Sequence, residues 1–196
     1  MKRTLAFTGL TLVLAVTARA DFSTIPLAPA SFNHDVVVES AAPASLSVAV
    51  NATQDAGTNK TGNTWYSIGY NAAAPTTGLP AAGSVVAATN VASHSYLMPP
   101  DYHTNNVVLV GHNGGGDTPL IPFGRLTLTT PAPFASLSFL TSAGNGPVLV
   151  GYVVNYADAS SESNTRRSWK NTSCKPITPR PILRQRLFES AVLGIA

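Results

Sequence analysis

The chain alternates between short runs of β-branched or aromatic residues and short polar breaks, and this pattern predicts an all-β fold. In "RLTLTT" the residues Leu126 and Leu128 share one face and Thr127 and Thr129 the other, as in a strand with one buried face. The 3.6-residue period of an amphipathic helix is not found over any window of useful length. The predicted strands cover residues 34–40, 45–51, 64–70, 84–89, 94–98, 105–111, 124–130, 136–142 and 147–157.

The breaks between these runs have the chemistry of turns. Gly and Asn in "GNGP" (144–147) and "TGN" (61–63) tolerate positive φ. We expect "LMPPDY" and "TTPAPF" to interrupt strands, because proline cannot donate to a β-ladder. The number and spacing of the strands predict a sandwich of two antiparallel sheets over residues 32–162, preceded by a linker at 21–31. The absence of a Cys-Trp-Cys pattern favours a jelly-roll-like arrangement over an immunoglobulin-like one.

The net charge of +3 divides into three segments of different sign. Residues 1–20 contain three basic residues and no acidic ones. Residues 21–164 contain two basic and eight acidic residues, a net charge of −6, whereas residues 165–196 contain seven basic residues and one acidic residue, a net charge of +6. The basic isoelectric point therefore describes no single predicted domain.

Residues 1–20 have the three parts of a secretory signal peptide: Lys2 and Arg3, an apolar run over 5–16, and the small residues Ala18 and Ala20 of "ARA". We expect cleavage after Ala20. The apolar run of about 12 residues is too short to cross a hydrocarbon core of roughly 30 Å as a helix. The pattern predicts a secreted or cell-surface protein with no membrane span in the mature chain.

The segment 163–196 differs from everything before it. Its sequence "SNTRRSWKNTSCKPITPRPILRQRLFES" has no period-2 pattern, and its single cysteine, Cys174, can form no internal disulfide. We expect a basic, disordered tail. An exported chain rarely meets nucleic acid, and no known module presents these basic residues, so we expect no nucleic-acid partner.

Several blocks occur in a specific order: "ASFNHDVVVES", "NTWYSIGYN", "GLPAAGSVV", "NNVVLV", "LTLTTPAPFASLSFLTSAGNGPV" and "VNYADAS". Over about residues 30–160 the chain resembles the β-sandwich ectodomain of exported proteins from environmental bacteria that end in a PEP-CTERM sorting tail. The resemblance implies a secreted or surface-sorted jelly-roll-like domain of no established activity, and it transfers no catalytic residue.

The chain departs from that family after "YADAS", where more strand residues, a Pro-Glu-Pro motif, an apolar helix and a basic cluster would follow. The simplest hypothesis is a reading-frame shift near codon 164, which would make the tail foreign to the fold. The strand at 147–157 would then lack a neighbour and expose an aggregation-prone edge.

"NTWYSIGYN" brings together Trp65, Tyr66 and Tyr70, the candidate ligand-binding residues. As a strand, this stretch would place Tyr66, Ile68 and Tyr70 on one face. Flat aromatic rings can stack on the apolar face of a sugar, and they also fill sandwich cores with their polar tips at the edge. One tryptophan in such a domain favours the core interpretation.

Acids and histidines lie at His34, Asp35, Asp55, His94, Asp101, His103, His112 and Asp117. "DYH" and "GHNGGGD" would supply Asp101 and Asp117 to a Ca²⁺ site if the two loops met, because Ca²⁺ prefers oxygen ligands. Neither loop has a known ligand spacing, so solvated loops are favoured and no cofactor is expected, with Ca²⁺ as the open alternative.

No G-x-S-x-G elbow is present, and nothing distinguishes a pair of carboxylates for glycoside hydrolysis, so the sequence does not favour an enzyme. We expect an exported, non-catalytic surface or matrix protein of unknown specific activity, with extracellular polysaccharide or another envelope polymer as its partner. The alternative is a carbohydrate-binding module, and the third possibility is a hydrolase that acts on polysaccharide.

Overall fold

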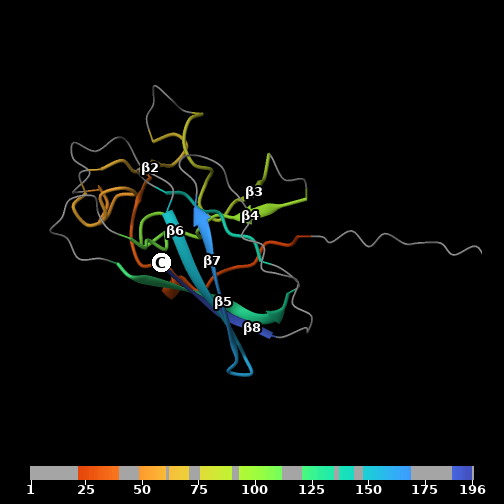
Figure 1. The fold of residues 1–196 in the computed structure, drawn as a ribbon. Coiled ribbons are helices and arrows are strands. Elements are labelled where there is room, and N and C mark those ends of the chain that lie inside the picture. Colours follow the sequence, from red (N-terminus) through yellow and green to blue (C-terminus); the bar gives the residue numbers. More distant parts are fainter. Residues whose placement is uncertain are drawn as a thin grey trace, which may run out of the picture.

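The computed structural model describes residues 22–39, 49–60, 62–70, 76–89, 93–111, 121–134, 137–143, 148–168 and 187–195. The predicted signal peptide, with Ala18 and Ala20, lies outside these residues. Within them the elements are one 3-10 helix and eight strands (Figure 1), namely η1 (Pro29–Ser31), β1 (Val37–Val38), β2 (Trp65–Tyr66), β3 (Val85–Ala87), β4 (Ser95–Leu97), β5 (Phe123–Pro133), β6 (Val148–Tyr156), β7 (Ser161–Ser168) and β8 (Leu187–Ile195).

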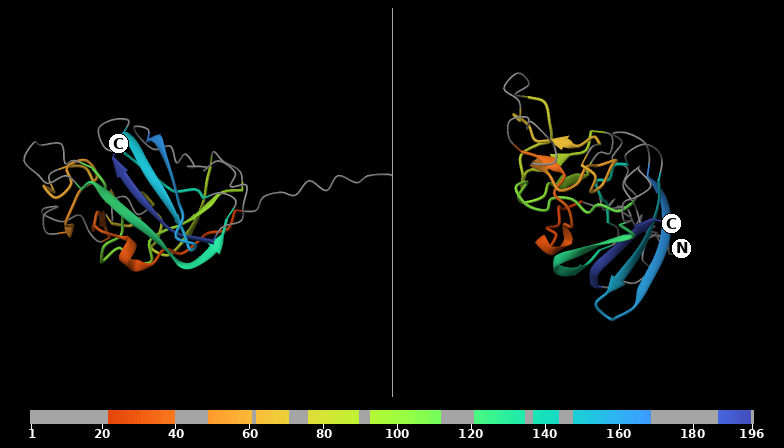
Figure 2. Two further views of the ribbon diagram at one scale, coloured as in Figure 1. Left: turned by 60° about the horizontal axis from the view of Figure 1, so that its bottom comes forward. Right: turned by 90° about the vertical axis from the view of Figure 1, so that its left-hand side faces the viewer.

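The four longest strands form one antiparallel sheet in the order β5-β8-β6-β7. Strands β6 and β7 are joined by a tight turn in which Ala159 has a φ of 63° and the Asp158 carboxylate accepts the N–H of Ser160 over 3.0 Å. Figure 2 shows this sheet on one side of the molecule, with the small sheets β1-β2 and β3-β4 on the other.

The two small sheets differ in direction. Strands β3 and β4 are antiparallel, with Val85 opposite Leu97, whereas β1 and β2 are parallel, with Val37 opposite Trp65. The prediction of an all-β fold is therefore confirmed, but the expectation of antiparallel pairing throughout is wrong for β1-β2. The sandwich and its jelly-roll order stay predictions.

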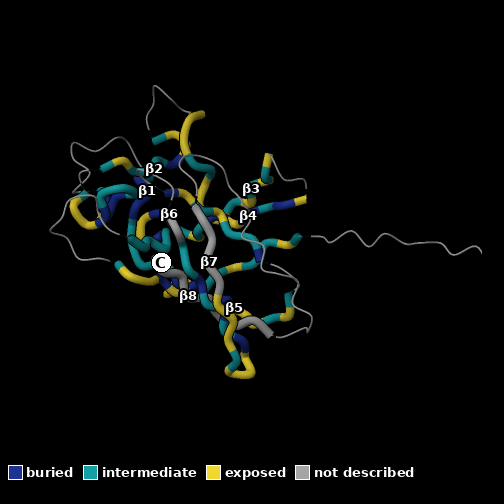
Figure 3. Tube along the Cα trace, viewed as in Figure 1, coloured by how far each residue is buried: buried dark blue, intermediate teal, exposed yellow. Residues whose placement is uncertain are grey.

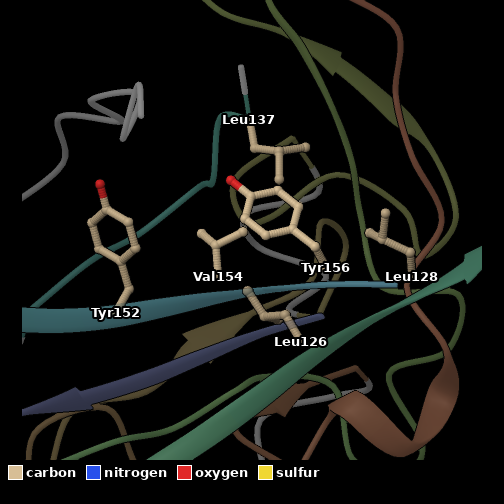
Figure 4. Packing of buried hydrophobic residues seen from close by; sticks show 6 residues of the cluster. All are labelled: Leu126, Leu128, Leu137, Tyr152, Val154 and Tyr156. Atoms are coloured by element: carbon tan, nitrogen blue, oxygen red, sulfur yellow. The ribbon is translucent and has the colours of Figure 1, made fainter. Parts of the chain in front are cut away.

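The larger core lies against the four-stranded sheet. Alternate residues of β5 and β6 point to the same side of the sheet, as expected for period-2 strands. Figure 4 shows Val154 and Tyr156 next to Leu137, which comes from the segment between β5 and β6. The buried cluster consists of Leu126, Leu128, Leu137, Tyr152, Val154 and Tyr156. The alternation that predicted one buried face at 124–130 is confirmed.

A second cluster lies beside the small sheets and consists of Val37, Met98 and Tyr102. Figure 3 shows buried, dark blue stretches of the chain beside β1. Residues 36–38 are buried on both faces, each only 2% exposed. This burial explains why the stretch is three consecutive valines and does not alternate between apolar and polar residues.

Strand β5 continues through Pro131 to Pro133, so the expectation that "TTPAPF" ends a strand is wrong. The register with β8 shifts between Thr127 and Ala132, and β5 is the edge strand of its sheet. Proline is tolerated at edges and bulges because no ladder hydrogen bond is lost there. "LMPPDY" does end a strand, since β4 stops at Leu97.

Two segments of the expected disordered tail form strands. Residues 161–168 pair with β6, and residues 187–195 insert between β5 and β6, with Leu193 opposite both Gly124 and Tyr152. Residues 169–186, with Cys174, lie outside the described residues. Strand β6 thus has a neighbour on each side, β7 and β8, so the expectation of an exposed edge at 147–157 is wrong.

Three other predicted strands differ from the structure. Ala49 is helical, and residues 40–48 lie outside the described residues. Residues 105–111 contribute only isolated bridges, at Val107 to His34 and at Gly111 to Ile121. Residues 137–142 lie against the sheet without joining it, because Leu137 and Phe139 contribute side chains to the core instead of backbone to a ladder.

Candidate functional site

The candidate site is built around Asn106, a side chain with no exposed surface. Its Oδ1 accepts the backbone N–H of Val36 over 3.0 Å and of Val37 over 3.2 Å. Its Nδ2 lies within 3.0 Å of three acceptors, which are Oδ1 of Asp35 at 2.7 Å and the carbonyls of Tyr102 and Thr104. One buried amide therefore joins β1 to the loop at 101–106.

Asn33, three residues before Val36, makes a similar connection. Its Nδ2 donates to the carbonyl of Leu109 over 2.9 Å, and its Oδ1 accepts the N–H of Leu109 over 2.8 Å. The Asn33 side chain thus makes the pair of hydrogen bonds that a neighbouring strand would make. We call residues 31–38 and 101–109 the amide-held region.

The amide-held region carries a pocket of about 730 Å³ on its surface. Its apolar wall consists of Pro29, Ala30, Phe32 and Pro100. The short helix η1 positions Phe32, whose N–H donates to the carbonyl of Pro29 over 3.1 Å. Polar side chains line the rest of the pocket, and they are Asp35, Asn51, Asp101, His103, Thr104 and Asn105.

Hydrogen bonds hold the polar wall in place. Oδ1 of Asn51 accepts the N–H of Asp35 over 2.8 Å, and Nδ2 of Asn51 donates to Oδ1 of Asn105 over 3.3 Å. Asp101 accepts the N–H of His103 over 2.9 Å and the hydroxyl of Thr104 over 3.3 Å. The pocket thus combines an aromatic ring with several fixed donors and acceptors.

Asp35 has an unusual electrostatic environment. Burial raises the pKa of its carboxyl, and the negative charges of Glu39 and Asp101 raise it further. The hydrogen bond from Asn106 and the charge of His103 act in the opposite direction, yet the pKa stays above its ordinary value. His103 itself lies 2.8 Å from Glu39, measured from Nδ1 to Oε1.

Two further side chains, Tyr102 and His34, contribute to the packing of the amide-held region. Burial raises the pKa of Tyr102 to about 12, and its hydroxyl donates to the carbonyl of Pro80 over 2.8 Å. Burial lowers the pKa of His34, whose Nδ1 lies 2.9 Å from Oδ1 of Asn33. Both side chains therefore stay neutral at pH 7 and serve the packing of the amide-held region.

None of the three candidate ligand-binding aromatic residues lines this pocket. Trp65 packs against the second core cluster, half-buried opposite Val37. The strand stops at Tyr66, and the next residues turn, because Gly69 has a φ of 79° and the N–H of Tyr70 donates to the carbonyl of Ser67 over 3.1 Å. The expected strand face of Tyr66, Ile68 and Tyr70 is therefore wrong.

Tyr66 and Tyr70 do meet across that turn. Their ring centroids are 4.2 Å apart with an interplanar angle of 35°, and both side chains are half-buried. The pair forms a small aromatic surface, separate from the pocket, with Ile68 beside it at 45% exposure.

The candidate calcium ligands are only partly described. Asp101 uses both carboxylate oxygens to accept hydrogen bonds from its own loop, and Asp117 lies outside the described residues. Among the residues that the structure describes, no group of three His, Cys, Asp or Glu side chains is arranged to hold a metal ion. In the same part of the chain, no helix is long and apolar enough to cross a membrane.

Comparison of the chain with models of known families, with curated proteins and with solved structures found no match. The case for a function therefore rests on the chemistry of the site, because a fold alone does not determine an activity.

Asp35, Asp101 and His103 were among the acids and histidines considered from the sequence, but Phe32 and the asparagines were not. The clusters "SFNHD" and "TNN" were available signals, because a polar residue inside an apolar run must find a partner when it is buried. Their meeting depends on contacts across 70 residues or more, which no local pattern reports.

Proposed function

We propose that the protein is an exported, non-catalytic surface or matrix component that binds extracellular polysaccharide in the pocket beside Asp35. The leader-like pattern of residues 1–20 supports export. The observation that carries the binding role is the pairing of the Phe32 ring with amide and carboxylate side chains in one pocket.

The chemistry of the pocket suits a sugar. A pyranose has an apolar face that packs on an aromatic ring, and hydroxyl groups that both donate and accept hydrogen bonds. Phe32 supplies the ring, whereas Asn51 and Asn105 supply amides that can do both. A volume of about 730 Å³ lies within the range of small-molecule sites.

The test is a titration of the full chain against a panel of neutral and charged oligosaccharides by calorimetry. We expect dissociation constants near the millimolar to micromolar range, because the pocket is open and small. Phe32→Ala should weaken binding about tenfold, since it removes the stacking ring. Failure of every glycan to bind would overturn the proposal.

Phe123→Ala is the matched control, because Phe123 is 63% exposed on β5 and does not line the pocket. It removes the same side chain elsewhere on the surface and should leave affinity unchanged. If Tyr66→Ala or Tyr70→Ala abolished binding while Phe32→Ala did not, the tyrosine pair would be the binding surface instead. Release of reducing sugar that depends on Asp35 would favour the hydrolase.

A further inference from the structure

Asp35 has one carboxylate oxygen held and one open. Its Oδ1 accepts the hydrogen bond from Nδ2 of Asn106 over 2.7 Å, and its backbone is fixed on both sides by Asn51. No hydrogen bond reaches Oδ2 from any residue that the structure describes. The carboxylate is thus preorganised, with an unused acceptor in a residue that lines the pocket.

The negative charge around the pocket is only partly compensated. Asp35 and Asp101 line it, and Glu39 acts on Asp35 from nearby. Among the described residues that line the pocket none is lysine or arginine, and the nearest basic group, His103, faces Glu39. A negatively charged ligand would therefore meet repulsion, whereas a cation would relieve it.

We propose that the pocket selects polysaccharides whose sugar residues carry a protonated amine, with Oδ2 of Asp35 as the acceptor for the ammonium group. The Phe32 ring packs on the face of the same sugar, and the Asn51 and Asn105 amides bind its hydroxyls. This inference rests on the proposed function and names its ligand class. It excludes uronic-acid polymers as ligands.

The raised pKa of Asp35 agrees with this assignment. Burial and two neighbouring carboxylates disfavour its charged form, and an ammonium group at Oδ2 would favour that form again. Binding of an amine should therefore lower the pKa of Asp35, whereas binding of a neutral sugar of the same shape should not lower it.

The experiment compares three oligosaccharides on the full chain: a glucosamine tetramer, an N-acetylglucosamine tetramer and a galacturonic acid tetramer. The first two share a backbone and differ in the charge of the nitrogen. We expect the amine form to bind at least tenfold more tightly than the acetylated form, and the acid not to bind. The preference should shrink at high salt, because the ion pair is partly exposed.

Asp35→Asn should remove the preference for the amine while keeping the acceptor for Asn106, so the pocket stays assembled. Glu162→Gln removes the same charge from an exposed position outside the pocket and should leave the preference unchanged. A carbon NMR titration of the Asp35 carboxyl gives an independent readout, with its pKa lowered on amine binding alone.

The outcomes separate the two proposals. Equal affinity for the amine and acetylated tetramers, or a preference that survives in Asp35→Asn, would overturn the amine assignment and leave polysaccharide binding standing. Binding of none of these or of any other glycan would overturn both.

Discussion

The four-stranded sheet and the amide-held region satisfy their backbone hydrogen-bonding groups in different ways. In the sheet, strands of eight to eleven residues satisfy one another's backbone groups, and apolar side chains stack on one face. In the amide-held region the strand β1 is two residues long, and the side chains of Asn33 and Asn106 supply the missing partners. The stability of the sheet therefore depends on buried apolar area, whereas that of the amide-held region depends on the hydrogen bonds of two asparagine side chains.

This difference bears on where function resides. A sheet face buried against a core leaves no polar groups for a ligand. A region held by amides must bring polar side chains together, and some of them, such as Asn51 and Asn105, remain exposed at its rim. The pocket lies where the backbone ladder ends, on loops held by a rigid scaffold.

The largest effect should come from removing β8. Ending the chain at residue 186 would leave β5 and β6 with unpaired inner edges, because each pairs with β8 and not with the other. We expect loss of more than about 5 kcal/mol of stability, which would unfold most domains, and aggregation of the product. The measurement is soluble yield and ultracentrifugation.

If the shortened chain were instead soluble and as stable as the full chain, β8 would not belong to the sheet. That result would favour the hypothesis of a foreign tail. Deleting residue 196 alone leaves β8 intact and serves as the control for handling the chain end.

In the amide-held region, Asn106→Leu should cost about 4 kcal/mol, because it strips partners from the buried N–H groups of Val36 and Val37 and from two carbonyls. Asn105→Leu, on the exposed neighbour, should cost less than about 0.5 kcal/mol. Urea unfolding measures both. Equal costs would mean that the amide at 106 does not hold the region together.

For the sheet, Leu126→Ala should cost about 3 kcal/mol, as expected for a leucine 5% exposed in a packed cluster. It should leave oligosaccharide affinity unchanged, whereas Asn106→Leu should also weaken binding by releasing Asp35. A matching loss of affinity in both variants would erase the distinction between the two regions.

The smallest effect concerns the charge of Asp35. Because its folded pKa is raised above 3.8, the folded state holds the proton more strongly than the unfolded state, and stability falls as pH rises through this range. Asp35→Asn should therefore be slightly more stable than the parent at pH 7, with the difference gone near pH 3. Urea midpoints at both values test this, and a less stable variant at pH 7 would contradict it.

Local pattern predicted the parts of the fold that local physics determines. The alternation at 124–130 and the run at 147–157 correspond to β5 and β6, since each strand has one face on the core. The strand over residues 187–195 was missed in a tail of basic composition, although "LFESAVLGI" is apolar enough to pair with both β5 and β6. Composition over 34 residues obscured a nine-residue strand.

The candidate site was harder to predict for a physical reason. Aromatic residues are conspicuous in a sequence, so Trp65, Tyr66 and Tyr70 became the candidate ligand-binding residues, although a core role was favoured for the tryptophan. Trp65 packs against the second core cluster. Asparagine is common in turns, so Asn106 was not distinguished from its neighbours. Only the approach of residues 35–37 to residue 106 shows that this amide is buried.

Because the amide-held region depends on the side-chain amide of Asn106, chemical damage to that amide would weaken the region. Hydrolysis of the Asn106 amide releases ammonia and leaves a carboxylate, which would place an oxygen against Asp35 where a donor now lies at 2.7 Å. Two anions at that distance repel, and the loop at 101–106 would separate from β1. Burial and the β-branched Val107 that follows slow this reaction, so the lifetime of the pocket is set by how rarely Asn106 meets water.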